Sequence, residues 1–384
     1  MSGYILLVGA VFKEEAVEAT LALAASGNYW RRGLYRGLLQ NDCEIKVLGH
    51  RGEQAWPKGK LFPNEVDFLD PEFDSTLVKW VNLPGVRYPL LGQRFITTLR
   101  QMIRAYGKPS VILTYNPYPW HLPLARYAQE KHSIPWVSVT LDYDYVEAGW
   151  DQYLKDAGDA AGHVFLSHWA YTECPCAAPK LHMDGGFDEW LGDEIFSVEP
   201  NAKKVCLYSG KYADYGGYQL LLEMVRELKG ADVEFWFTGK VPEAKRKELE
   251  SLGDHVRILG FVNEEKLHDL SVRADVFLNP RPSHLIENKV AFPSKIVRYL
   301  AYGKPIVSTW TPGISPEYRD YLFVPDREDG QSFAEMIRKV LAFTESDKDE
   351  LKRKIRGFIE RDKSWTVQAK RLKTWLETEN LIKK

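Results

Sequence analysis

The regular alternation of short β-rich runs with helical runs after residue 204 constrains the fold of this chain most strongly. In order, these runs are VCLYSG, YQLLLEMVREL, VEFWFTG, PEAKRKELESL, VRILGFV, EEKLHDLSVR, ADVFLNP, FPSKIVRYLAYGK and PIVST. Such alternation is typical of βαβ units, whose parallel strands form one sheet covered by helices on both faces. The second half of the chain is therefore predicted to be a doubly wound α/β domain.

The first half shows the same rhythm less regularly. Its predicted strands are YILLVGAV, CEIKVLGH, VDFLD, SVILTYN, WVSVTLD and HVFLS, and its predicted helices include WRRGLYRGLLQ, GQRFITTLRQMIRAY and LPLARYAQEK. The 384 residues exceed the roughly 250 to 300 at which single cores stop growing. We therefore expect two Rossmann-like α/β domains facing a cleft, over residues 1–185 and 200–360. Their boundary falls in the Gly-, Asp- and Glu-rich stretch between His182 and Asn201.

The overall charge excludes one class of partner. The chain has 51 Lys and Arg against 53 Asp and Glu, a formal net charge of −2. This balance gives no global attraction for nucleic acid, so nucleic-acid binding is not expected.

The longest apolar run near the start, from Tyr4 to Val11, is far shorter than the roughly 20 residues that span a bilayer, so no membrane-spanning helix is expected there. With four cysteines, two of them in strand-like runs, a cytoplasmic setting fits best.

The stretch FPSKIVRYLAYGK predicts a short helix with cations near its start. Pro293 suits the first helical position and Gly303 a left-handed position after the end, so we expect a helix from about Ser294 to Tyr302. Lys295 and Arg298 would then lie close to free helix amides. This combination favours a phosphate group as ligand, with ordinary surface charges as the alternative interpretation.

These motifs together resemble the GT-B fold glycosyltransferases, and in particular the large retaining family 4 type of nucleotide-sugar transferases. YSGKY at 208–212, FWFTGK at 235–240, RILGFVNEEKLHDLSVRADVFLNPR at 257–281 and the FPSK helix follow in the family's order. The resemblance implies that the second domain binds the nucleotide sugar and the first binds the acceptor. It also implies that the helix at 364–384 crosses back onto the first domain.

The resemblance assigns roles to particular residues. It implies that catalysis involves Lys211, Glu287, Lys295 and Asp142. Donor binding would involve Gly210, Gly239, Phe261, Val262, Arg281, Phe292, Pro293, Ser294 and Arg298. Acceptor binding would involve Asn28, Tyr29, Trp30, Tyr143 and Asp144. Asp142 and Asp144 can equally be turn residues that bond nearby backbone amides.

The chain departs from the family pattern at two positions. The family carries two glutamates eight residues apart, where this sequence has Val290 and Arg298. The second glutamate holds ribose hydroxyls in the family, a role that Arg298 cannot take because it has no hydrogen-bond acceptor. We expect Arg298 to bind phosphate instead and Glu287 to supply the missing carboxylate.

The expected activity is transfer of a sugar from a nucleotide diphosphate sugar to a saccharide or lipid-linked saccharide, without cofactor or bound metal. Zinc bound by Cys174 and Cys176 with His168 and His182 is the weaker alternative, since no second paired motif follows. The basic, aromatic run at 29–39 is compatible with contact to the inner face of a membrane. An epimerase or hydrolase on the same fold and a catalytically silent nucleotide-binding subunit are the alternatives for the whole chain.

Overall fold

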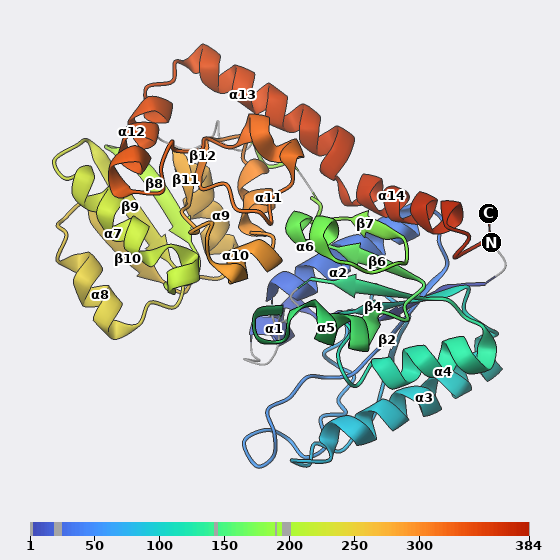
Figure 1. Cartoon of the computed structure of the whole chain (residues 1–384). Coiled ribbons are helices and arrows are strands. Elements are labelled where there is room, and N and C mark those ends of the chain that lie inside the picture. The colour runs from blue at the N-terminus through green and yellow to red at the C-terminus, as the bar shows by residue number, and fades with distance from the viewer. Residues whose placement is uncertain (1–2, 19–24, 142–144, 189, 194–200, 384) are drawn as a thin grey trace. The chain divides into compact units, whose positions relative to one another are not determined.

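The chain forms two compact units. The computed structural model describes residues 3–18, 25–141, 145–188, 190–193 and 201–383. The first unit comprises Met1–Leu166, Ala170–Gly186 and Trp365–Lys384, and the second comprises Ser167–Trp169 and Phe187–Ser364 (Figure 1). The crossing from Gly186 to Phe187 lies inside the stretch in which the sequence analysis placed the boundary.

The first unit contains a seven-stranded parallel sheet in the order β3-β2-β1-β4-β5-β6-β7. Its strands are β1 (Ile5–Val8), β2 (Ile45–Gly49), β3 (Ser75–Leu77), β4 (Val111–Tyr115), β5 (Trp136–Thr140), β6 (Gly162–Phe165) and β7 (Lys180–His182). In β1 all four side chains are buried, as expected for a central parallel strand covered by helices on both faces.

Helices follow most of these strands. They are α1 (Glu14–Glu18), α2 (Ala25–Gln40), α3 (Arg87–Tyr106), α4 (Leu122–His132), α5 (Tyr145–Ala157) and α6 (His168–Glu173). The apolar side of α3, with Leu91, Phe95 and Leu99 at helical spacing, packs with α4 on one face of the sheet. The three helical runs predicted for this half are thus confirmed.

One predicted strand in this half is wrong. The run VDFLD at 66–70 forms a turn, and only Leu69 makes an isolated antiparallel bridge, to Phe12. Its side chains do not alternate between a buried and a solvent face, since Val66 is 55% exposed and Phe68 lies under the guanidinium of Arg51 at 4.0 Å. The edge strand is instead β3, which pairs with β2.

The last helix, α14 (Trp365–Thr378), belongs to the first unit, where it packs along α2. Two glycines of α2 allow this close approach. A Cβ at Gly33 would collide with the indole of Trp365, and a Cβ at Gly37 would lie 2.8 Å from the carbonyl carbon of Trp365. From the sequence, residues 364–384 are expected on this domain.

The second unit contains a five-stranded parallel sheet in the order β10-β9-β8-β11-β12. Its strands are β8 (Lys204–Ser209), β9 (Val233–Thr238), β10 (Val256–Gly260), β11 (Val276–Asn279) and β12 (Ile306–Ser308). Alternate residues of β11 face opposite layers: Val276 and Leu278 join the core under α7 and α12, while Phe277 stacks on Tyr299 at 4.3 Å. Each predicted strand of this half is confirmed.

The helices of the second unit are α7 (Tyr218–Glu227), α8 (Glu243–Glu250), α9 (Glu264–Arg273), α10 (Ile286–Val290), α11 (Lys295–Leu300), α12 (Gly330–Leu341) and α13 (Glu345–Phe358). The FPSK helix is α11, which is shorter at both ends than predicted. Gly303 has the predicted left-handed conformation, with φ +63°.

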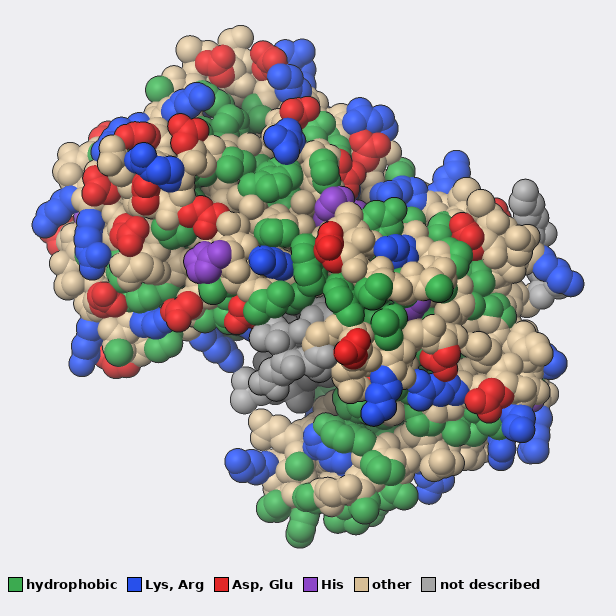
Figure 2. Space-filling model, in the orientation of Figure 1, with side chains coloured by type: hydrophobic (Ala, Val, Ile, Leu, Met, Phe, Trp, Pro, Cys, Tyr) green, Lys and Arg blue, Asp and Glu red, His purple; other side chains and the backbone are tan. Residues whose placement is uncertain are grey.

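The surface carries charges of both signs. On the face shown in Figure 2, Lys and Arg side chains alternate with Asp and Glu side chains. This mixture agrees with the net charge of −2.

Candidate functional site

The strand order of the second unit identifies where a ligand would bind. The chain runs from β8 outward to β9 and β10, then returns to the other side of β8 as β11 and β12. Open parallel sheets bind ligands beyond the carboxyl ends of the strands at the point where this order reverses. In this unit that point lies between Ser209 at the end of β8 and Asn279 at the end of β11.

The loop after β8 is folded tightly around Tyr208. The phenol of this residue donates a hydrogen bond to the backbone carbonyl of Lys211 at 2.7 Å and lies 3.1 Å from that of Gly216. Gly217 has φ +83°, and a Cβ there would collide with the carbonyl of Pro280. The loop therefore needs glycine to turn between the ends of β8 and β11. Lys211 points its side chain into solvent and makes no ion pair with a described residue.

Lys295, the first residue of α11, reaches back to this loop. Its ammonium lies 4.3 Å from the centroid of the Tyr208 ring, and a Cβ at Gly210 would lie 2.5 Å from its Nζ. Lys295 forms no hydrogen bond or ion pair with any residue that the structure describes. Burial, followed by the positive charge of Arg281, holds the pKa of Lys295 well below its usual value. An anion bound here would offset both effects, because its negative charge stabilises the protonated ammonium.

Arg281 follows β11 and is positioned by Asn288 of α10. Its Nη1 lies 3.4 Å from the side-chain oxygen of Asn288. The amide of Asn288 in turn donates to the carbonyls of Tyr215 and Pro282, both at 2.9 Å. This buried asparagine thus connects the segments that follow β8 and β11. The two cations Arg281 and Lys295 consequently lie at the same end of the sheet.

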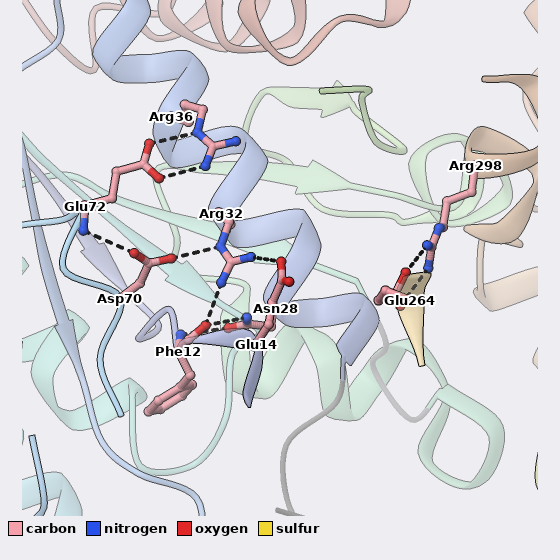
Figure 3. A network of polar contacts seen from close by, with 9 residues as sticks. All are labelled: Phe12, Glu14, Asn28, Arg32, Arg36, Asp70, Glu72, Glu264 and Arg298. Carbon is pink, nitrogen blue, oxygen red and sulfur yellow. Dashed lines mark hydrogen bonds and ion pairs between the residues drawn. The ribbon is translucent and has the colours of Figure 1, made fainter. Parts of the chain in front are cut away.

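Arg298 has a partner that the sequence analysis did not foresee. Its guanidinium pairs with both carboxylate oxygens of Glu264, at the start of α9, with 3.2 Å between Nη1 and Oε1 (Figure 3). Both side chains are about half exposed. The expected phosphate-binding role of Arg298 therefore competes with an ion pair that already neutralises it, whereas Lys295 has no such partner among the described residues.

The other predicted donor-site residues differ in exposure. Phe292 and Pro293 are buried, with the Phe292 ring 5.4 Å from that of Tyr318. Ser294 and Glu287 are exposed, and the Glu287 carboxylate makes no hydrogen bond or ion pair within the described ranges. Phe292 and Pro293 can thus support the site only by packing in the core, while Ser294 and Glu287 are accessible to a ligand.

Three predicted donor-site residues lie at the ends of β9 and β10. Gly239 has φ +119°, and a Cβ there would collide with the carbonyl of Gly210, so a larger residue would push apart the loops after β8 and β9. Phe261 is 69% exposed and Val262 is half-buried. The exposed ring of Phe261 is available to stack on a planar ligand.

Two of the predicted acceptor residues, Asn28 and Trp30, are buried in the first unit. The Asn28 side chain is buried and bonds both the amide and the carbonyl of Phe12, at 2.9 and 2.8 Å (Figure 3). Trp30 is buried against Tyr115 and Trp365, while Tyr29 is half-buried with its ring edge toward Trp365. The remaining predicted residues, Asp142, Tyr143 and Asp144, lie outside the described residues.

The structure brings a different histidine to the cysteine pair than the sequence analysis considered. Cys176 is half-buried, and the neighbouring Cys174 thiol, followed by His163, lowers the pKa of Cys176 to about 5. His163, from β6, also bonds the hydroxyl of Tyr153 at 2.8 Å. No spacing in the sequence indicated His163, because it comes from a neighbouring strand.

Sequence reasoning also missed Tyr208, Glu264 and Asn288. Tyr208 was quoted only as part of the YSGKY motif, and its role depends on the loop that folds back over it. Asn288 directly follows Glu287, the residue that the sequence singled out for its charge, and its buried contacts join segments more than 70 residues apart. The ion pair of Glu264 with Arg298 joins α9 to α11, which no local pattern predicts.

Comparison with known protein families confirms the expected resemblance for the second unit. Residues 203–342 match the model of the family described as glycosyl transferases group 1. This match supports placing the protein among the transferases. No curated protein sequence matches the chain.

Solved structures extend the likeness to the whole chain. A glycosyltransferase from Rickettsia africae ESF-5 has a TM-score of 0.73 at 12% identity, with 99% of each chain covered. Sucrose-phosphate synthase from Thermosynechococcus elongatus has a TM-score of 0.69 at 14% identity over 98% of each chain. HepE from Anabaena, solved with UDP and glucose, has a TM-score of 0.65 at 13% identity over 98% of this chain and 100% of its own. The predicted GT-B fold class is thereby confirmed.

Among the described residues, no helix is both long and apolar enough to cross a membrane.

Proposed function

We propose that this protein is a glycosyltransferase that moves a sugar from a nucleotide diphosphate sugar, of the UDP or GDP type, to a saccharide or lipid-linked saccharide. The observation that carries the proposal is the placement of Lys295. Its ammonium is half-buried beside Arg281, at the strand ends where such sheets bind ligands, without an anionic partner among the described residues. A diphosphate supplies the missing negative charge.

The chemistry follows from the charge that develops during transfer. Breaking the bond between the sugar and the diphosphate leaves negative charge on the phosphate oxygens, and fixed cations next to that charge lower the barrier. Lys295 and Arg281 take this role, with the exposed Lys211 as a third cation. Because these side chains supply the positive charge, we propose that the reaction needs neither metal nor cofactor.

The proposed stereochemical course is retention of configuration, as in the family that the sequence resembles. The leaving phosphate then accepts the proton of the acceptor hydroxyl. Glu287, exposed on α10 and without a described partner, is the carboxylate that we assign to the transferred sugar. Asp142 remains the proposed group for orienting the acceptor hydroxyl. The transferred sugar would enter polysaccharide or glycoconjugate synthesis in the cytoplasm, at the inner face of the membrane when the acceptor is lipid-linked.

UDP is the first nucleotide to test, because Anabaena HepE has been solved with UDP and with UDP-glucose. A nucleotide-binding subunit without activity is the second candidate. It is favoured by Val290, which is buried, and by Arg298, which is engaged with Glu264, at the two positions where the resembled family has glutamates. An epimerase or hydrolase would act on the donor alone.

Product analysis separates these functions. Purified protein is incubated with UDP-glucose and GDP-mannose, with and without pooled saccharide and lipid-linked acceptors, and the products are identified by mass spectrometry. We expect nucleotide release that requires an acceptor and is lost in Lys295→Met. Lys247→Met, on the exposed surface of α8, is the matched control and should retain activity. Release without acceptor would indicate a hydrolase, a new nucleotide sugar an epimerase, and binding without turnover the silent subunit.

A further inference from the structure

Helix α2 of the first unit carries three arginines, and two of them are neutralised by carboxylates. Arg36 makes two hydrogen bonds of 2.7 Å with one carboxylate. Arg32 pairs with two carboxylates, one of them at 2.9 Å from its Nε, and also donates to the carbonyl of Phe12 at 2.9 Å. Figure 3 shows these partners, which are Glu72 for Arg36 and Asp70 and Glu14 for Arg32.

Arg31, the third arginine, is different. It makes no hydrogen bond or ion pair with any residue of the described ranges, and its Nε is buried without a hydrogen-bond partner. The central carbon of its guanidinium lies 4.3 Å from the centroid of the Tyr115 ring. Stacking on an aromatic ring orients a guanidinium, but it leaves the charge and the donors unsatisfied. A half-buried guanidinium in this state is expected to recruit an anion.

The position of Arg31 is one where sheets of this kind bind ligands. Tyr115 ends β4 and Gly9 follows β1, and the strand order of the first sheet reverses between these two strands. A Cβ at Gly9 would lie 3.0 Å from Cδ of Arg31 and 2.9 Å from Cβ of Tyr115. A Cβ at Gly27 would collide with the hydroxyl of Tyr115. The absence of side chains at both glycines leaves the backbone close to the guanidinium.

The positive charge of Arg31 also affects two nearby histidines, the half-buried His50 and the buried His121. Burial lowers the pKa of His50 to about 3, with further lowering by His121, Arg31 and Arg87. Burial also lowers the pKa of His121 to about 4, and Arg31 again contributes to the lowering. Both imidazoles are thus neutral near pH 7, and Arg31 is the cation that remains next to Tyr115.

We propose that Arg31 binds an anionic group, a phosphate ester, on the acceptor of the transfer reaction. The inference rests on the proposed function, because it names the class of acceptor that the first unit would take. A guanidinium offers two parallel N–H donors to two phosphate oxygens, a geometry that discriminates phosphorylated from neutral saccharides. The donor diphosphate has its own cations, Lys295 and Arg281, in the second unit, which leaves Arg31 for the acceptor.

The test compares matched ligands and matched variants of the full chain by isothermal titration calorimetry. The ligands are inorganic phosphate, glucose 6-phosphate, glucose and UDP. The variants are Arg31→Gln and, as control on the same helix, Arg36→Gln, whose arginine is neutralised by Glu72. We expect both phosphate ligands to bind the wild-type protein and the control, glucose to bind at least about tenfold more weakly, and Arg31→Gln to lose about tenfold or more in phosphate affinity. Melting curves of both variants show whether they are folded.

Other results would decide against the inference or against the proposed donor site. The inference is overturned if phosphate ligands bind no better than glucose, or if Arg31→Gln binds them as wild type does. It is also overturned if Arg31→Gln loses UDP affinity to the same degree, because the anion would then be the donor diphosphate. If UDP fails to bind the wild-type protein while phosphate binding depends on Arg31, the proposed donor chemistry fails and the anion site stands.

Discussion

The ammonium of Lys295 lies over the ring of Tyr208, 4.3 Å from its centroid, at the end of the central strand β8. The contact places a cation against the bare backbone of Gly210 and close to a second cation, Arg281. Such an arrangement is unfavourable in the empty protein and becomes favourable when an anion binds. Its energetic cost in the free protein is therefore expected to appear as a pH effect on ligand binding.

The first prediction is that UDP binding takes up a proton through Lys295. The pKa of this lysine is lowered in the free protein, so its ammonium loses its proton below the unperturbed pKa of 10.5. A bound diphosphate raises the pKa again, so affinity should fall with rising pH. Calorimetry in buffers of different ionisation enthalpy, between about pH 8 and about pH 10, avoids the phosphate ionisation near pH 6.

Lys295→Met serves as the comparison for this effect. The variant should bind UDP more weakly and without the proton uptake above about pH 8, because the titrating group is gone. Equal proton uptake in the wild-type protein and in Lys295→Met would show that another group titrates and would remove Lys295 from the diphosphate site.

The second prediction concerns the ion pair between Arg298 and Glu264. Both side chains are about half exposed, so the pair should contribute only about 0.2 to 1 kcal/mol to the free energy of unfolding. A double-mutant cycle with Arg298→Ala and Glu264→Ala, followed by urea denaturation, measures this coupling. We also expect Arg298→Ala to weaken UDP binding less than Lys295→Met does. A larger loss in Arg298→Ala would restore the phosphate-binding role predicted from the sequence.

The third prediction tests the packing of α14 on α2. Gly37→Ala should lower the free energy of unfolding by about 1 to 3 kcal/mol, because the added methyl group would meet the backbone carbonyl of Trp365. Gly357→Ala, in α13, is the control, since a Cβ there meets nothing within 4 Å. Chemical denaturation compares the two variants. The described packing would be contradicted by a Gly37→Ala protein as stable as the wild type.

The fourth prediction is that Cys176 is the most reactive of the four cysteines. The neighbouring Cys174, followed by His163, lowers the pKa of Cys176 to about 5, so its thiol is ionised at neutral pH. The other three thiols, Cys43, Cys174 and Cys206, are buried and have raised pKa values. Timed iodoacetamide labelling with peptide mass spectrometry should find Cys176 modified first, and more slowly in His163→Phe. Preferential labelling of any other cysteine would contradict this.

The strands were predicted correctly from the sequence where the local hydrophobic pattern agrees with the burial that the tertiary structure imposes. Each predicted strand and helix of the second half formed, because buried parallel strands are short apolar runs separated by amphipathic helices. VDFLD failed because its composition suits a strand, whereas an exposed Val66 and a Phe68 covered by Arg51 leave it no buried face. Short runs of this kind are decided by their tertiary contacts.

The candidate site was harder to predict because its decisive features are pairings between distant residues. Sequence position alone could not show that Arg298 meets Glu264, or that Arg32 and Arg36 find carboxylates while Arg31 does not. The aromatic run at 29–30 suggested acceptor contact, yet Trp30 packs against Trp365, a contact that only the fold supplies. Lys295 was identified from its motif, although its lack of a described partner required the structure.

The most direct test of the central claim is a titration of the full chain with UDP in which the melting temperature of the protein is measured at each UDP concentration. The wild-type protein, Lys295→Met and the surface control Lys247→Met are compared. A ligand that binds only the folded state stabilises it by about 2.7 kcal/mol at a concentration one hundred times its Kd. The account predicts a clear rise in melting temperature for the wild type and the control, and little or none for Lys295→Met. GDP, ADP, TDP and CMP are screened beside UDP to identify the base. An equal rise in Lys295→Met, or no rise with any of these nucleotides, would contradict the donor site proposed around Lys295.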